Sequence, residues 1–170
     1  MKMWLASGII ASLIATVAVA EGVGQWRSLD ADDTSATFFD QQSLEKIGPT
    51  GGRATFAVAW KKPDDAVYPT FRIHNVSVVE EVWESDCKRG TISLARRIYY
   101  SEYGDQLEEV RASSPVARAP IPGSPGMEIL NLLCGHSQLL GAMFEVGPAG
   151  LVKVVRETRV EPKSGHGGAG

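Results

Sequence analysis

Residues 75–100 read NVSVVEEVWESDCKRGTISLARRIYY, and this stretch decides the fold. Its apolar side chains alternate with a period of two over residues 75–86, so Cys87 extends one of the two faces of this predicted strand. Lys88-Arg89-Gly90 is typical of a tight turn, and such a turn joins neighbouring strands in opposite directions. The second strand, residues 91–100, is expected to carry one apolar side made of Ile92, Leu94, Ile98 and Tyr100.

Shorter strands are predicted on both sides of this hairpin, over residues 25–29, 35–39, 53–61 and 107–111. In the third of these, Ala57 and Ala59 form a face of small side chains, which predicts that another element packs close against it. Lys62-Pro63-Asp64-Asp65 breaks the alternation and is expected to end that strand. Asp40 is placed to cap a short helical turn over residues 41–44.

The chain changes character after residue 111. Residues 114–125 contain four prolines and predict an extended connector. Residues 126–134 are the clear helical candidate, with an apolar stripe made of Met127, Leu130 and Cys134. The fold class is therefore α+β, an antiparallel meander of about five or six strands with a C-terminal helix on one face.

The first twenty residues have the pattern of a cleaved leader. Lys2 precedes an uncharged apolar run that ends in Ala18-Val19-Ala20, the small-x-small pattern cut by signal peptidase. We therefore expect residues 1–20 to be a signal peptide cut between Ala20 and Glu21. An uncleaved anchor is the alternative, although the run is short of the roughly 20 residues that a membrane span needs. No cysteine lies near the cut, so an exported protein, periplasmic or secreted to the cell surface, is expected rather than a lipoprotein.

Export to an oxidising compartment favours a disulfide between the two cysteines. Cys87 and Cys134 are the only cysteines, and both fall on predicted inward faces, so a disulfide is the simplest reading. A redox pair is the alternative, but such pairs are normally the closely spaced C-x-x-C. A metal ligand is the other, and tetrahedral zinc takes at least three protein ligands.

The order of these features resembles the surface-adhesin protein E family. The pieces that carry the resemblance are Trp26, Phe39-Asp40 with Ser43-Leu44, Trp60-Lys61-Lys62-Pro63, Trp83-Glu84-Ser85-Asp86-Cys87-Lys88-Arg89, Tyr99-Tyr100, Ala119-Pro120-Ile121-Pro122-Gly123-Ser124, Glu128-Ile129-Leu130 and Cys134. The resemblance implies an antiparallel sheet with its C-terminal helix tethered across one face by the disulfide. It also implies adhesion to host matrix proteins.

The resemblance suggests a division of the chain. We expect an adhesin E-like domain over residues 21–136, a C-terminal extension over residues 137–160 and a disordered tail over residues 161–170. Within the extension, a short helix is expected in residues 139–144 and an alternating strand in residues 151–160.

Composition argues against several classes of function. The formal net charge is −3, and loss of Lys2 with the leader makes it more negative, which argues against nucleic-acid binding. No second apolar segment is long enough to span a bilayer. The three histidines, His74, His136 and His166, stand in no recognisable catalytic motif, and no G-x-S-x-G elbow is present. The sequence therefore predicts no enzyme, no metal site and no cofactor.

A binding function has weaker support from one cluster of side chains. Arginine and tyrosine, the residue types enriched at interface hot spots, gather around the strand at residues 91–100 as Arg89, Arg96, Arg97, Tyr99 and Tyr100. The alternative is that these arginines pair with nearby glutamates and the tyrosines cover the sheet. Two functions follow: a non-enzymatic adhesion module for host extracellular-matrix or envelope proteins, or a structural or accessory periplasmic protein of the cell envelope.

Overall fold

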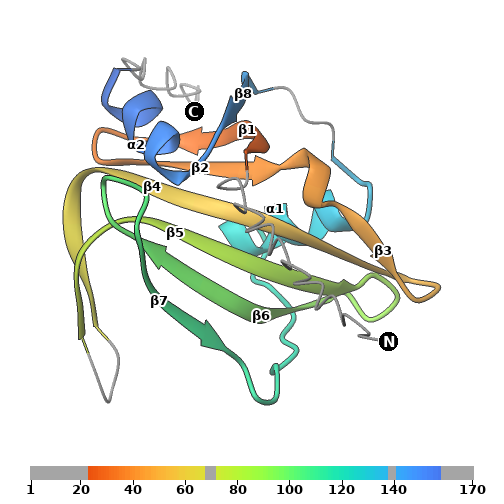
Figure 1. Cartoon of the computed structure of the whole chain (residues 1–170). Helices are drawn as coiled ribbons and strands as arrows, with labels where there is room; N and C mark the ends of the chain where they lie inside the picture. Colours follow the sequence, from red (N-terminus) through yellow and green to blue (C-terminus); the bar gives the residue numbers. More distant parts are fainter. Residues whose placement is uncertain (1–22, 68–71, 138–140, 158–170) are drawn as a thin grey trace, which may run out of the picture.

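A computed structural model describes residues 23–67, 72–137 and 141–157, and within them the chain forms an eight-stranded antiparallel sheet with two α-helices (Figure 1). The strands are β1 (Gly24–Ala31), β2 (Ser35–Asp40), β3 (Glu45–Ile47), β4 (Gly51–Val67), β5 (Arg72–Asp86), β6 (Thr91–Tyr100), β7 (Gln106–Arg111) and β8 (Met143–Val146). The helices are α1 (Pro125–Leu133) and α2 (Pro148–Glu157), with a 3₁₀ turn η1 (Gln41–Ser43). The α+β class is confirmed. The expected leader and tail lie outside the described residues.

The strands follow a meander, as expected. Their order across the sheet is β7-β6-β5-β4-β2-β1-β8, with β3 paired to β4 beside this path. Each pair is antiparallel, and β6 pairs along its length with the second part of β5, from Val78 opposite Tyr100 to Asp86 opposite Thr91. The short strands β3 and β8 add to the number expected from the sequence.

Strand β4 does not end where the sequence predicted. It runs to Val67, and Lys62-Pro63-Asp64-Asp65 lies within it rather than breaking it. The pairing with β5 shifts between Ala59 and Asp64, which marks a bulge. A bulge is one of the few places where a strand accepts proline, because the ladder there does not need its missing N–H.

The expected order of elements after Cys134 is wrong. The strand is β8, and the segment from residue 148 to 157 is the helix α2. Its buried side chains Leu151, Val152 and Val155 have the spacing of a helix face. Pro148 opens the helix, where its missing N–H has no cost.

The two helices cover opposite faces of the sheet (Figure 1). On one face, α2 shares a buried cluster with Trp26, Phe38, Ala57 and Ala59. Both alanines are fully buried, so the face of small side chains does receive a closely packed element, as predicted. On the other face, α1 packs against a second cluster that includes Phe39 and Phe56, whose ring centroids lie 5.2 Å apart.

The four apolar residues of β6 do not share one side. Trp83 pairs with Leu94 and Val82 with Arg96, so Ala95 is an extra residue and the alternation reverses there. Leu94 and Ile92 therefore line a groove with Trp83 on the α1 side. Tyr100 packs on the cluster beneath α2.

The disulfide ties α1 to the end of β5. Cys87 directly follows β5 and Cys134 caps the C-terminus of α1, with their Cα atoms 5.6 Å apart. This is the tether that the sequence predicted, and it leaves no free cysteine among the described residues.

Candidate functional site

The disulfide lies in the wall of an open cleft of about 730 Å³ at one corner of the sheet. We call this the corner cleft. Its sides are the turn between β3 and β4, the disulfide with Lys88, and the C-terminal end of α1. Five side chains define its character: Leu44, Lys46, Lys88, Leu132 and Leu133. Three segments far apart in sequence thus meet at one concave surface.

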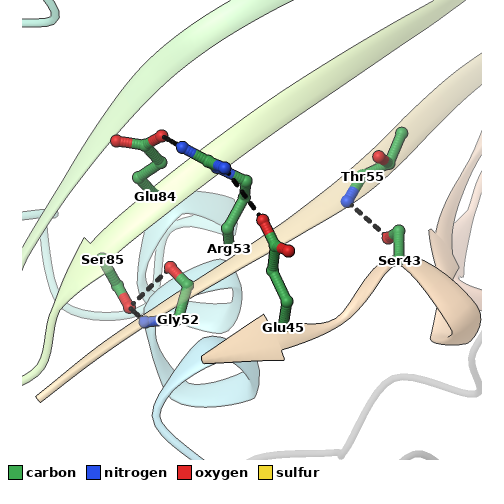
Figure 2. Close-up of polar contacts among 7 residues, drawn as sticks. All are labelled: Ser43, Glu45, Gly52, Arg53, Thr55, Glu84 and Ser85. Atoms are coloured by element: carbon green, nitrogen blue, oxygen red, sulfur yellow. Dashed lines mark hydrogen bonds and ion pairs between the residues drawn. The ribbon is translucent and has the colours of Figure 1, made fainter. Parts of the chain in front are cut away.

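Close contact between α1 and β4 forms the floor of the corner cleft. Leu132 and Leu133 are buried there. A Cβ added to Gly52 would lie 2.5 Å from the carbonyl oxygen of Leu133, so only glycine permits this approach. The Ser85 hydroxyl accepts a hydrogen bond from the Gly52 N–H at 3.0 Å (Figure 2). It also lies 3.6 Å from the Cys87 Sγ. The buried hydroxyl fixes the strand ends on which the cleft is built.

An ion-pair network lies next to the floor of the corner cleft in sequence, and its side chains are on the face of the sheet opposite α1. The Arg53 Nη1 lies 2.9 Å from the Glu45 carboxylate, and the same guanidinium donates to Glu84 (Figure 2). Hydrogen bonds to Glu84 and then Glu45 raise the pKa of Arg53 above its ordinary value. Glu45 lines the corner cleft and shares the single positive charge of Arg53 with Glu84.

The mouth of the corner cleft is left with positive charge. Lys46 and Lys88 are both exposed, and neither side chain has an ion pair or hydrogen bond within the described parts of the chain. The nearby Asp86 accepts the backbone N–H groups of Lys88 and Arg89 and faces the Arg89 guanidinium at 3.5 Å. Asp86 is therefore matched and Glu45 is matched in part, while the ammonium groups of Lys46 and Lys88 have no partner among the described residues.

The comparison with protein-family models decides the family. The model described as "Surface-adhesin protein E" matches residues 26–135, well over half of the chain. The chain belongs to the surface-adhesin protein E family. No curated protein and no solved structure matches it.

The part that matches the adhesin E model contains both cysteines and all of α1. Strand β8 and helix α2 lie beyond it but pack within the same fold. Trp26 of β1 pairs with Phe144 of β8, and Leu151 is fully buried in the cluster that includes Trp26. The adhesin E part therefore completes its core with residues that follow the match.

The structure spreads the predicted binding residues of this family member over several surfaces. Arg96 and Arg97 point to opposite faces, where they pair with Glu109 at 3.8 Å and Glu81 at 2.6 Å. Tyr99 is 2 % exposed and belongs to a buried cluster. The Tyr100 hydroxyl donates to Glu80 at 3.1 Å. Arg89 lies in the turn beside the corner cleft, away from the other four.

Sequence reasoning missed the corner cleft because it forms only when the β3–β4 turn meets the end of α1. The available signal was small: Lys46 next to a glycine-rich turn and Lys88 next to Cys87. Nothing in the spacing of these residues brings the two lysines together before the disulfide is placed.

The described residues contain no group of three or more histidine, cysteine, aspartate or glutamate side chains arranged to hold a metal ion. Helices in the described ranges are all too short or too polar to cross a membrane. The corner cleft combines the half-exposed Leu44 with the two exposed lysines, Lys46 and Lys88.

Proposed function

We propose that this member of the surface-adhesin protein E family is an exported, non-enzymatic binding module that attaches to host extracellular-matrix proteins. Support comes from the family membership together with the corner cleft, where two cations without partners stand on a covalently tethered frame. Adhesion needs a surface that stays in shape outside the cell, and a disulfide is a common means to that end in small exported domains.

One observation carries the proposal further than the family does. Lys46 and Lys88 lie beside apolar side chains in the corner cleft and have no ion-pair partner among the described residues. Exposed charges of this kind add little to the stability of the fold. Charge kept at an apolar concavity favours a complementary partner instead. The competing function is an accessory role in the cell envelope. The two functions differ in where the protein is located, outside the cell or in the periplasm.

The binding test uses the exported, oxidised protein. It is titrated over immobilised extracellular-matrix glycoproteins and over an outer-membrane protein extract, with serum albumin as the blank surface. We expect saturable binding to at least one matrix glycoprotein and none to albumin. Absence of saturable binding to every matrix surface would overturn the adhesion proposal.

Location is tested on intact producing cells treated with an added protease. An adhesin is digested on the intact cells, because its binding surface must reach the outside. A protein that resists until the outer membrane is permeabilised is periplasmic, and that outcome would support the accessory envelope role in place of adhesion.

A further inference from the structure

We propose that the corner cleft binds an acidic segment of a partner protein, which inserts a leucine-like side chain between Lys46 and Lys88. This inference rests on the proposed binding function and names the chemistry of the partner. It differs from the arginine and tyrosine cluster on β6, whose side chains are buried or matched by glutamates.

The size and lining of the cleft fit an apolar anchor. A volume of about 730 Å³ lies within the range of pockets that enclose ligands. Leu132 and Leu133 at the floor are largely buried, at 8 % and 7 % exposed, so the open apolar area comes mainly from Leu44 at the rim, which is 45 % exposed. Apolar area left open at such a site is removed from water when an apolar side chain enters.

The positive charges at the mouth of the cleft favour acidic residues on both sides of the inserted apolar side chain. Arg53 pairs with both Glu45 and Glu84, and Arg89 faces Asp86. With Lys46 and Lys88 added, the four cations around the mouth outnumber the three carboxylates by one. The whole chain carries a formal charge of −3, so its net charge does not attract an acidic segment. A local positive cleft on an acidic protein guides such a segment to one place.

The frame of the cleft is arranged before binding. The disulfide fixes the end of α1, and Ser85 holds Gly52 through its N–H and its carbonyl, at 3.0 and 3.3 Å. A site that is already ordered loses less conformational entropy on binding. On the protein's side, the conformational entropy still to be lost is that of the two lysine side chains.

The test uses a fluorescein-labelled hexapeptide, Glu-Asp-Leu-Leu-Asp-Glu, and measures fluorescence anisotropy against the oxidised full chain. The matched comparison peptide has lysine in place of every acidic residue. We expect saturable binding of the acidic peptide, weakening as salt is raised, and at least tenfold weaker binding of the basic peptide. Equal binding of the two peptides would overturn the proposal.

Substitutions in the cleft test whether the acidic peptide binds there. The double substitution Lys46→Glu with Lys88→Glu is expected to raise the Kd for the acidic peptide at least tenfold, and Leu44→Ser at least threefold. Lys153→Glu on α2 is the control, because Lys153 is an exposed lysine on the other face of the sheet, and its Kd should stay within twofold. Lys46→Gln with Lys88→Gln keeps the test valid if the charge reversal unfolds the protein, and should still weaken binding.

The remaining outcomes separate this inference from the proposed function. Saturable binding to matrix glycoproteins that is unchanged by the double lysine substitution would overturn the corner cleft as the site and leave adhesion standing. Binding of anionic phospholipid vesicles, lost in the double variant while the peptide fails to bind, would show that the lysines recognise lipid and would overturn a protein partner.

Discussion

Glu80 lies half-buried on the α2 face of the sheet, with the Tyr100 hydroxyl donating to its carboxylate at 3.1 Å. Burial raises the pKa of Glu80, and the Tyr100 hydrogen bond and Arg96 oppose this only in part. The folded state therefore favours the protonated acid. Its contribution to stability is complete below the pKa of the unfolded chain, about 4.3, and is lost as the pH rises through the raised folded-state value.

We therefore expect Glu80→Gln to be stabilising at pH 8, by a few degrees in Tm, and to give no gain at pH 4. Glutamine keeps an oxygen that accepts from Tyr100 but carries no charge to desolvate. The measurement is thermal unfolding at both pH values, with Glu108→Gln on the exposed edge strand as control. A lower Tm for Glu80→Gln at pH 8 would show that attraction to Arg96 outweighs burial.

At the scale of elements, the packing of α1 on β4 depends on one missing side chain. Gly52→Ala puts a methyl group 2.5 Å from the Leu133 carbonyl oxygen, and backbone cannot move aside without shifting the helix. We expect a loss of about 2 kcal/mol, as for other overpacked sites, and a Tm lower by about 4–8 °C.

The control for Gly52→Ala is Gly48→Asn. Gly48 has φ +62° and no atom within 4 Å of its added Cβ, and asparagine tolerates this backbone region. Its Tm should stay within about 2 °C of the wild-type value. If Gly52→Ala melts no lower than this control, then α1 does not approach β4 as closely as described.

The elements show which parts of the fold can be predicted from sequence. The hairpin of β5 and β6 was predictable because alternation and a glycine turn act locally, and Gly90 does take φ +65°. The course of β4 past Pro63 was not, since a bulge depends on the partner strand. The valines of α2 favour a strand by local propensity. The segment is a helix because its apolar face is buried against Ala57 and Ala59.

The site was less predictable than the fold. The disulfide followed from compartment and spacing, and the structure confirms it. The corner cleft needs contacts among β3, β4 and α1 that no local pattern encodes. The arginines and tyrosines of β6 were singled out by residue type alone. Residue type does not reveal that Arg96 and Arg97 form salt bridges or that Tyr99 is buried.

At the scale of the whole molecule, the residues after Cys134 belong to the core. Leu151 of α2 is fully buried with Trp26 and Phe38 from the first two strands. We expect Leu151→Ala to cost about 3 kcal/mol, through lost burial and the cavity left behind, and to lower the Tm by about 6–12 °C.

The matched control for Leu151→Ala lies on the same helix. Lys153 is exposed and forms only a 3.9 Å pair with Glu157, so Lys153→Ala should change the Tm by no more than about 2 °C. Equal melting of the two variants would mean that α2 is dispensable to the fold.

We propose that the disulfide between Cys87 and Cys134 holds in shape the corner cleft, through which the protein binds its partner. The most direct measurement is the equilibrium binding of the oxidised protein to the matrix glycoproteins, beside that of the Cys87→Ser, Cys134→Ser double variant, with far-ultraviolet circular dichroism recording that the sheet is kept. We predict saturable binding by the oxidised protein and at least tenfold weaker binding by the variant. Equal binding by both, or saturable binding by neither, would contradict the account.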